Sequence, residues 1–268
     1  MKKSFSQHLL KDKDFLRRII NSADLKPDDI VFEIGAGTGM LTIEAAKKVK
    51  KVYAVEMERE IIKKLKGNIK FNNIQNVEIV EKNILNLNFK DYNCKKFKII
   101  GNIPYNITSK ILFKLFGEID KPSSYISCFN KIYLMLQKEV AKRLTAKPST
   151  KAYSPLSLSV QYFADVEILF EVPRQAFYPA PDVDSAFVSF TVRKNLTKIQ
   201  DPVMFTNVVR TAFQQRRKKI INSLQTLFRD KHKLSECLRK LNIDENSRAE
   251  NLSFNDFLFL ACELNVSN

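Results

Sequence analysis

The chain has 268 residues, of which 44% are hydrophobic and 28% are charged, as in an ordinary globular protein with one large domain and a small additional one. Its formal net charge of +16 is unusual, and it predicts a polyanionic partner, either nucleic acid or an acidic membrane surface. General surface charge in a Lys-rich proteome is the alternative interpretation.

The basic amino terminus has an apolar run of only two leucines, which is not the pattern of a signal peptide. No segment approaches the ~20 apolar residues of a membrane span. The four cysteines form no C-x-x-C pair and the chain has only two histidines, so we expect no metal site. Cysteines used in this way are typical of a reducing compartment, and we expect a cytoplasmic protein without a membrane partner.

Up to about residue 194, short apolar runs alternate with amphipathic stretches. The apolar runs predict strands within residues 29–37, 51–58, 77–85 and 97–105, and the stretches between them predict helices within 38–49, 58–69 and 107–119. Residues 154–173 also have strand-like content, and a proline-rich loop then precedes a closing strand. This α/β alternation predicts a Rossmann-like parallel sheet with helices on both faces and ligands at the carboxyl ends of its strands. We assign residues 1–194 to this domain.

From about residue 195 the pattern becomes helical. One long helix is expected over residues 203–228, because apolar residues recur there at helical spacing. Further helices are expected at 234–243 and 253–264, the last capped by Ser253 or Asn255. These residues predict a small all-α domain at 195–268.

A glycine-rich loop and an acidic residue mark the first two strand ends. Gly35, Gly37 and Gly39 follow the first strand at alternate positions, where they let the backbone approach a ligand closely. The third glycine comes too early for a pyrophosphate-binding G-x-G-x-x-G loop, which favours an uncharged or zwitterionic ligand. Glu56 ends the second strand, where a carboxylate can accept hydrogen bonds from ribose hydroxyls. Together these features are typical of S-adenosylmethionine-dependent methyltransferases.

Asn83 follows the third strand. Its amide oxygen could accept a hydrogen bond from the exocyclic amine of the cofactor's adenine. An ordinary turn asparagine is the alternative interpretation.

The fourth strand ends in Asn102-Ile103-Pro104-Tyr105. The Asn102 side-chain oxygen and the Ile103 carbonyl could accept the two N–H groups of an adenine amine and so direct its lone pair toward a sulfonium methyl group. Pro104 would fix the backbone that aims the carbonyl, and Tyr105 would offer a face for base stacking. A proline turn with a packed tyrosine is the alternative.

Seven segments then occur in the order expected for one family. They are SQHLL, EIGAGTGMLT, GNIPYNITSKIL, QKEVAKRL, AFYPAPDVDSAF, FQQRRKKIINSL and RAENLS. On these segments the chain resembles the ribosomal RNA adenine N6-dimethyltransferases almost from end to end. The last four resemble the small-subunit rRNA branch more than the macrolide-resistance enzymes that act on large-subunit rRNA.

The resemblance implies a class I methyltransferase sheet, S-adenosyl-L-methionine as cofactor and dimethylation of two adjacent adenosines in a hairpin near the 3′ end of small-subunit (16S) rRNA, within an assembling subunit. It implies that Phe177 sandwiches the target base opposite Tyr105. It also implies a set of cofactor contacts: His8, Leu10, Gly35, Gly37, Glu56, Asn83 and Asn102. A monomer is the expected oligomeric state.

Three residues depart from the family's usual pattern. Ser6 stands in place of glycine, which could alter how the amino-terminal segment closes over the cofactor. Asn83 stands in place of aspartate, so the adenine contact loses a charge but keeps an acceptor. Ile103 replaces the commoner leucine, a minor change because the backbone carbonyl carries the role.

Residues 193–240 contain thirteen Lys and Arg and three Asp and Glu, which supplies +10 of the net charge. The densest cluster is Arg216, Arg217, Lys218 and Lys219, and it predicts contacts with rRNA phosphates. Because the helical apolar stripe places Arg217 in line with Val209 and Phe213, we expect Arg217 to face a groove or the other domain instead of bulk water. A solvated helix face is the alternative, chiefly for the two lysines.

Two further functions stay open from the sequence. One is methylation of large-subunit rRNA, of the macrolide-resistance type. The other is a non-catalytic RNA-binding factor that kept the fold, although that interpretation predicts a decayed Asn-Ile-Pro-Tyr segment or glycine loop.

Overall fold

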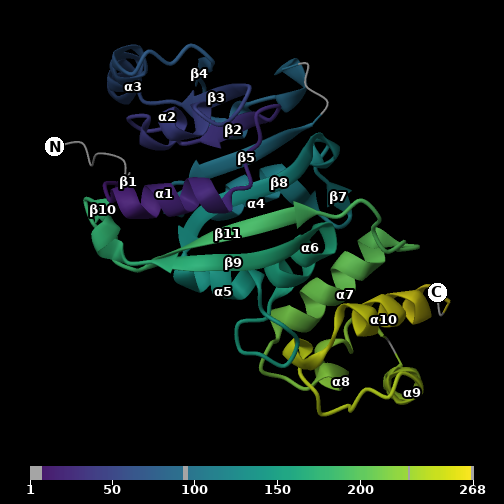
Figure 1. Ribbon diagram of the computed structural model, residues 1–268. Coiled ribbons are helices and arrows are strands. Elements are labelled where there is room, and N and C mark those ends of the chain that lie inside the picture. The colour runs from purple at the N-terminus through teal and green to yellow at the C-terminus, as the bar shows by residue number, and fades with distance from the viewer. Residues whose placement is uncertain (1–7, 93–95, 229, 267–268) are drawn as a thin grey trace. The chain divides into compact units, whose positions relative to one another are not determined.

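The computed structural model describes residues 8–92, 96–228 and 230–266 (Figure 1). The chain folds into two compact units. The first contains the residues up to Gly117 together with Ser123–Ala141 and Ala164–Val192, and the second contains Glu118–Pro122, Lys142–Phe163 and the residues from Arg193 onward. The second unit therefore includes the expected helical domain from residue 195 and also recruits residues 118–122 and 142–163.

The first unit is built on a seven-stranded sheet in the order β4-β3-β2-β5-β8-β11-β9 (Figure 1). The five strands from β4 to β8 are parallel, and β11 runs antiparallel to both β8 and β9. The expected Rossmann-like sheet is thus confirmed, with an antiparallel edge. The strand bounds are β2 Ile30–Ile34, β3 Lys51–Glu56, β4 Val77–Glu81, β5 Phe97–Asn102, β8 Phe129–Gln137, β9 Ala164–Val172 and β11 Ser185–Val192.

Helices follow the strands as predicted within residues 38–49, 58–69 and 107–119, and a fourth helix follows β8, where none was predicted. They are α2 Met40–Ala46, α3 Arg59–Phe71, α4 Thr108–Phe116 and α5 Lys138–Leu144. Between them lie short elements: the 3-10 turns η1 Ile84–Asn86 and η3 Tyr105–Ile107, and the two-residue strands β6 Gly117–Glu118 and β7 Lys121–Pro122. The strands β2, β3 and β5 are almost wholly buried, which explains why their sequences are largely apolar.

Two features near the amino terminus were not expected. Helix α1, Lys13–Ser22, is capped by the Asp12 side chain and buries Leu16, Ile19 and Ile20. Strand β1, Leu9–Leu10, pairs antiparallel with β10, Phe177–Tyr178, which lies in the proline-rich loop. Residues separated by almost 170 positions are therefore joined beside the carboxyl ends of the parallel strands.

Residues 154–173 divide into helix α6, Pro155–Phe163, and strand β9, so the strand-like interpretation is right only for the second half. In the second unit the single helix expected over 203–228 is also wrong. Helix α7, Pro202–Gln214, ends before the basic cluster, and α8, Ile220–Ser223, begins after it.

The remaining helices are α9, Lys231–Lys240, and α10, Phe254–Val266. The Ser253 hydroxyl accepts a hydrogen bond from the Asp256 N–H at 3.2 Å, and the Asp256 carboxylate accepts one from the Ser253 N–H at 2.7 Å. This reciprocal cap confirms Ser253 as the start of the last helix.

Candidate active site

The glycine loop turns back on the sheet directly after β2. Gly35 and Gly37 have φ values of +75° and +56°, a left-handed conformation that favours glycine. A Cβ on Gly35 would lie 3.2 Å from the backbone oxygen of Asn102, and a Cβ on Gly37 would lie 3.0 Å from Leu9 Cδ2. The loop therefore packs against β1 and the end of β5, which brings the predicted cofactor and substrate residues together.

Glu56 is fixed at the end of β3 by three backbone N–H groups. Its Oε2 accepts a hydrogen bond from Gly37 at 3.1 Å, and its Oε1 accepts from Met57 at 2.8 Å and from Glu58 at 3.1 Å. The side chain is only 3% exposed. Because Oε2 keeps a free lone pair and the residue lines an open groove, the carboxylate can accept a further hydrogen bond from a ligand hydroxyl.

That groove has a volume of about 400 Å³ and runs from the glycine loop to η1. Asn83 lies at its far end, where its Oδ1 accepts a hydrogen bond from the Leu85 N–H at 2.9 Å. One lone pair of this oxygen and both amide N–H groups are left for a ligand. The groove walls are otherwise largely apolar and suit a flat ring: Ile34, Val55, Met57, Ile84, Leu85, Pro104 and Ile107.

Asn102 ends β5 and lines two smaller pockets that both include Gly35 and Gly37. Its Nδ2 donates a hydrogen bond to the backbone oxygen of His8 at 2.7 Å. The amide orientation is thereby set, and Oδ1 is the atom left to accept a hydrogen bond from a substrate amine.

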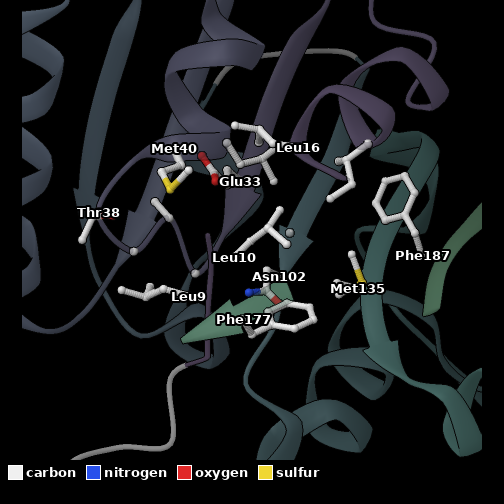
Figure 2. A pocket seen from close by; sticks show the side chains of 16 residues that line it. Leu9, Leu10, Leu16, Glu33, Thr38, Met40, Asn102, Met135, Phe177 and Phe187 are labelled. Atoms are coloured by element: carbon white, nitrogen blue, oxygen red, sulfur yellow. The ribbon is translucent and has the colours of Figure 1, made fainter. Parts of the chain in front are cut away.

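The first of these pockets is lined by Leu10 and Phe177 together with Asn102, and Figure 2 shows the three side chains grouped below Glu33. Phe177 is 1% exposed and belongs to the hydrophobic core of the first unit. Its ring is thus a wall of the pocket next to Asn102.

Tyr105 belongs to the second pocket, together with His8, Ile103 and Pro104. Its ring stacks on the His8 ring, with 5.8 Å between the ring centroids, and its hydroxyl is hydrogen bonded to Ser185 Oγ. Burial raises the pKa of Tyr105 above its ordinary value. The rings of Tyr105 and Phe177 therefore line separate pockets that meet at Asn102, and a base held between them remains a prediction.

Glu33 is a residue of the first pocket that the sequence interpretation did not single out. It is 1% exposed and accepts a hydrogen bond from Thr42 Oγ1. Burial raises its pKa to about 8, a rise that the neighbouring Glu56 charge adds to and the Thr42 hydrogen bond opposes. The sequence feature that could have pointed to Glu33 is a carboxyl residue inside an otherwise apolar strand.

The basic cluster lies in the turn between α7 and α8, not on a helix. Arg217, Lys218 and Lys219 are exposed, so the expectation that Arg217 avoids bulk water is wrong. Arg216 instead forms an ion pair with Glu250, with Nε 2.6 Å from Oε2, and donates a hydrogen bond to the Lys151 carbonyl.

The departure at Ser6 lies outside the described residues. Within the described ranges, no helix has the length and apolar character needed to cross a membrane. The same part of the chain contains no group of three or more His, Cys, Asp or Glu side chains placed to hold a metal ion.

Comparisons with known proteins cover the whole of this architecture. The sequence profile of the family described as "Ribosomal RNA adenine dimethylase" matches residues 1–265. A "Ribosomal RNA small subunit methyltransferase A" of Acaryochloris marina is 40% identical over 99% of this chain and 98% of its own. A "Probable ribosomal RNA small subunit methyltransferase A" of Methanosarcina barkeri is 40% identical over 93% of this chain and 83% of its own.

Among solved structures, a dimethyladenosine transferase from Plasmodium falciparum is similar with a TM-score of 0.78 and 30% identity, covering 97% of this chain and 98% of its own. The 23S rRNA methyltransferase ErmE shares the fold, with a TM-score of 0.73 and 24% identity over 96% of this chain and 99% of its own. On the full-length profile match and these relatives, the chain belongs to the ribosomal RNA adenine dimethylase family.

Proposed function

We propose that this protein dimethylates the N6 amines of two adjacent adenosines in the 3′-terminal hairpin of small-subunit rRNA, using S-adenosylmethionine as the methyl donor. The observation that carries the proposal is Asn102, whose amide nitrogen is engaged by His8 while its oxygen is left at the junction of two pockets. The small-subunit methyltransferases to which the chain is 40% identical support the choice of RNA.

The residues present fit the cofactor. The Glu56 carboxylate suits the ribose hydroxyls, and the apolar groove ending at Asn83 suits an adenine ring. The neighbouring pocket shares Gly35 with the groove, and its glycine loop and Asn102 would receive the amino acid end of the molecule. When bound, this cofactor would supply an electrophilic methyl group on a sulfonium.

The chain's own residues then have to hold the adenine amine in line with that methyl group. The Asn102 oxygen and the Ile103 carbonyl would accept the two N–H groups, and Pro104, with φ near −61°, would fix the turn between them. Positioning of two bound reactants can lower a barrier by ~7–11 kcal/mol, so no strong base is required. The amine proton becomes acidic as the new bond forms and can leave through the Asn102 oxygen to water.

The two units would have different roles in the reaction, one in catalysis and the other in RNA binding. The first would hold the cofactor and the target base, with Phe177 and Tyr105 on either side of it and with His8 and Leu10 beside the cofactor. The exposed Arg217, Lys218 and Lys219 of the second would contact rRNA phosphates, with Arg216 bracing their turn. We expect the protein to act as a monomer, in the cytoplasm, on immature small subunits.

A methyl-transfer assay tests this proposal. Small subunits that lack the two dimethyladenosines, and matched large subunits, are incubated with the protein and labelled S-adenosylmethionine. We expect incorporation of about four methyl groups per small subunit, two on each adenosine, and none into large subunits. Incorporation into large subunits alone would support the macrolide-resistance alternative, and small-subunit binding without incorporation would support a non-catalytic factor.

A further inference from the structure

The proline-rich loop presents an exposed aromatic side chain beside the candidate active site. Tyr178 is 71% exposed, whereas its neighbour Phe177 is 1% exposed. Because successive side chains of a strand point to opposite faces, β10 buries one ring and displays the other. The proposed reaction uses the buried ring and leaves Tyr178 without a role.

The pairing of β10 with β1 locates this exposed ring. Tyr178 is directly opposite Leu9, and residues opposite each other in an antiparallel pair present their side chains on the same face. Leu9 lines both of the small pockets that meet at Asn102. Leu10 and Phe177, on the opposite face, line the first pocket and not the second, so Tyr178 stands on the face of the β1–β10 ribbon that borders the pocket of Tyr105.

The loop is braced on both sides of Tyr178. His8 Nδ1 is hydrogen bonded to the Pro179 carbonyl at 2.7 Å, and the Lys11 N–H donates to the Ala176 carbonyl at 2.9 Å. Further along, the Arg174 N–H donates to Asp184 Oδ1 at 3.1 Å. An exposed ring on a braced loop is preorganised, so little conformational entropy is lost when a ligand stacks on it.

We propose that Tyr178 is the stacking platform for the base adjacent to the target adenosine, an inference that rests on the proposed function. An adenosine that enters the pocket must leave its stack, and its neighbour then loses one stacking partner. An aromatic ring next to the pocket replaces that partner whatever the base is, because every base has a π face. The exposed Lys11 and Arg174 beside the same loop attract the flanking phosphates.

The absence of tryptophan from the chain allows a direct test. Tyr178→Trp introduces a single tryptophan at the proposed platform. Phe71→Trp introduces one at the end of α3, where Phe71 is 85% exposed, and serves as the matched control. On titration with unmethylated small ribosomal subunits, we expect emission from position 178 to be quenched by base stacking and emission from position 71 to stay unchanged. Equal responses at the two positions would overturn the proposal.

Affinity measurements on the same subunits complete the test. Tyr178→Ala should weaken subunit binding about tenfold, the effect of losing one base stack, whereas Tyr178→Phe and Phe71→Ala should bind like the wild type. Affinity for S-adenosylmethionine should be unchanged in all of them. Wild-type subunit binding by Tyr178→Ala, or a loss of cofactor affinity instead, would overturn the proposal while leaving the proposed function intact. A wild-type protein that neither binds nor methylates these subunits would overturn both.

Discussion

The side-chain nitrogen of Asn102 donates a hydrogen bond to the backbone oxygen of His8, 2.7 Å away. The two residues are 94 positions apart and meet only because β1 pairs with β10 beside the end of β5. The bond fixes which end of the Asn102 amide faces the pocket, so the acceptor oxygen is directed toward the substrate side without a charged group.

Replacing Asn102 tests this orientation. Asn102→Ala removes the acceptor for the adenine amine, and we expect kcat to fall at least about a hundredfold while subunit binding stays unchanged. Single-turnover methyl transfer and filter binding measure the two quantities. Asn130→Ala, an exposed residue in β8, is the control. A variant at Asn102 with nearly normal turnover would show that the amine is held by other groups.

Glu56 is expected to control cofactor affinity. Glu56→Gln places an N–H₂ group where the carboxylate accepts hydrogen bonds from Gly37, Met57 and Glu58, and it weakens the acceptor for the ribose. Loss of a hydrogen bond to a charged group costs ~1.5–3 kcal/mol, so calorimetry should show at least a tenfold rise in Kd for S-adenosylmethionine. Exposed Glu60, changed to Gln, should leave the Kd as it is. Unchanged affinity in the Glu56 variant would place the ribose elsewhere.

Glu33 predicts a pH dependence of folding stability. Its pKa is raised to about 8 in the folded protein. Its contribution to the free energy of unfolding is therefore complete below the ordinary carboxyl pKa and is lost as the pH rises through about 8. Glu33→Gln should therefore flatten the fall of the free energy of unfolding between pH 5 and pH 8, by an amount of the order of a few kcal/mol. Urea unfolding of both proteins across this range measures the difference. Parallel curves would mean that Glu33 is already ionised at low pH.

In the basic turn at residues 216–219, we expect Arg216 to stabilise the fold and the other three residues to bind RNA. Changing Arg217, Lys218 and Lys219 together to Gln should reduce the slope of log K against log salt by about 0.7–0.9 for each phosphate that the variant no longer neutralises, with little change in stability. Arg216→Gln breaks the pair with Glu250 and should instead lower the free energy of unfolding by about 1 kcal/mol. Salt titrations of subunit binding and denaturant unfolding distinguish them. The reverse pattern would make Arg216 the phosphate-binding residue.

The sequence predicts the first four parallel strands and the position of the site well, because these strands are largely apolar and their carboxyl ends carry the polar residues Glu56, Asn83 and Asn102. The break after Gln214 escapes prediction for a physical reason. Phe213 and Ile220 are seven residues apart, so apolar spacing stays in helical phase across the turn even though the helix ends. Periodicity reports which residues are buried and not whether the backbone between them is helical.

The site contacts that escaped prediction all join distant residues. Asn102 with His8, Tyr105 with Ser185 and Arg216 with Glu250 depend on β1 pairing with β10 and on the packing of each unit. Local sequence gives the residue types needed for the chemistry, whereas the tertiary fold determines which of their atoms remain available to a ligand. Arg216 illustrates the difference. Its charge predicts a phosphate contact, whereas its ion pair with Glu250 indicates that it stabilises the turn.

The central claim, dimethylation of adjacent adenosines in small-subunit rRNA, is tested most directly in cells with and without the protein. Primer extension along both rRNAs stops at N6-dimethyladenosine. We predict a stop at two adjacent adenosines near the 3′ end of the small-subunit rRNA, present with the wild-type protein and absent without it or with Asn102→Ala alone. A stop found only in the large-subunit rRNA would contradict the account.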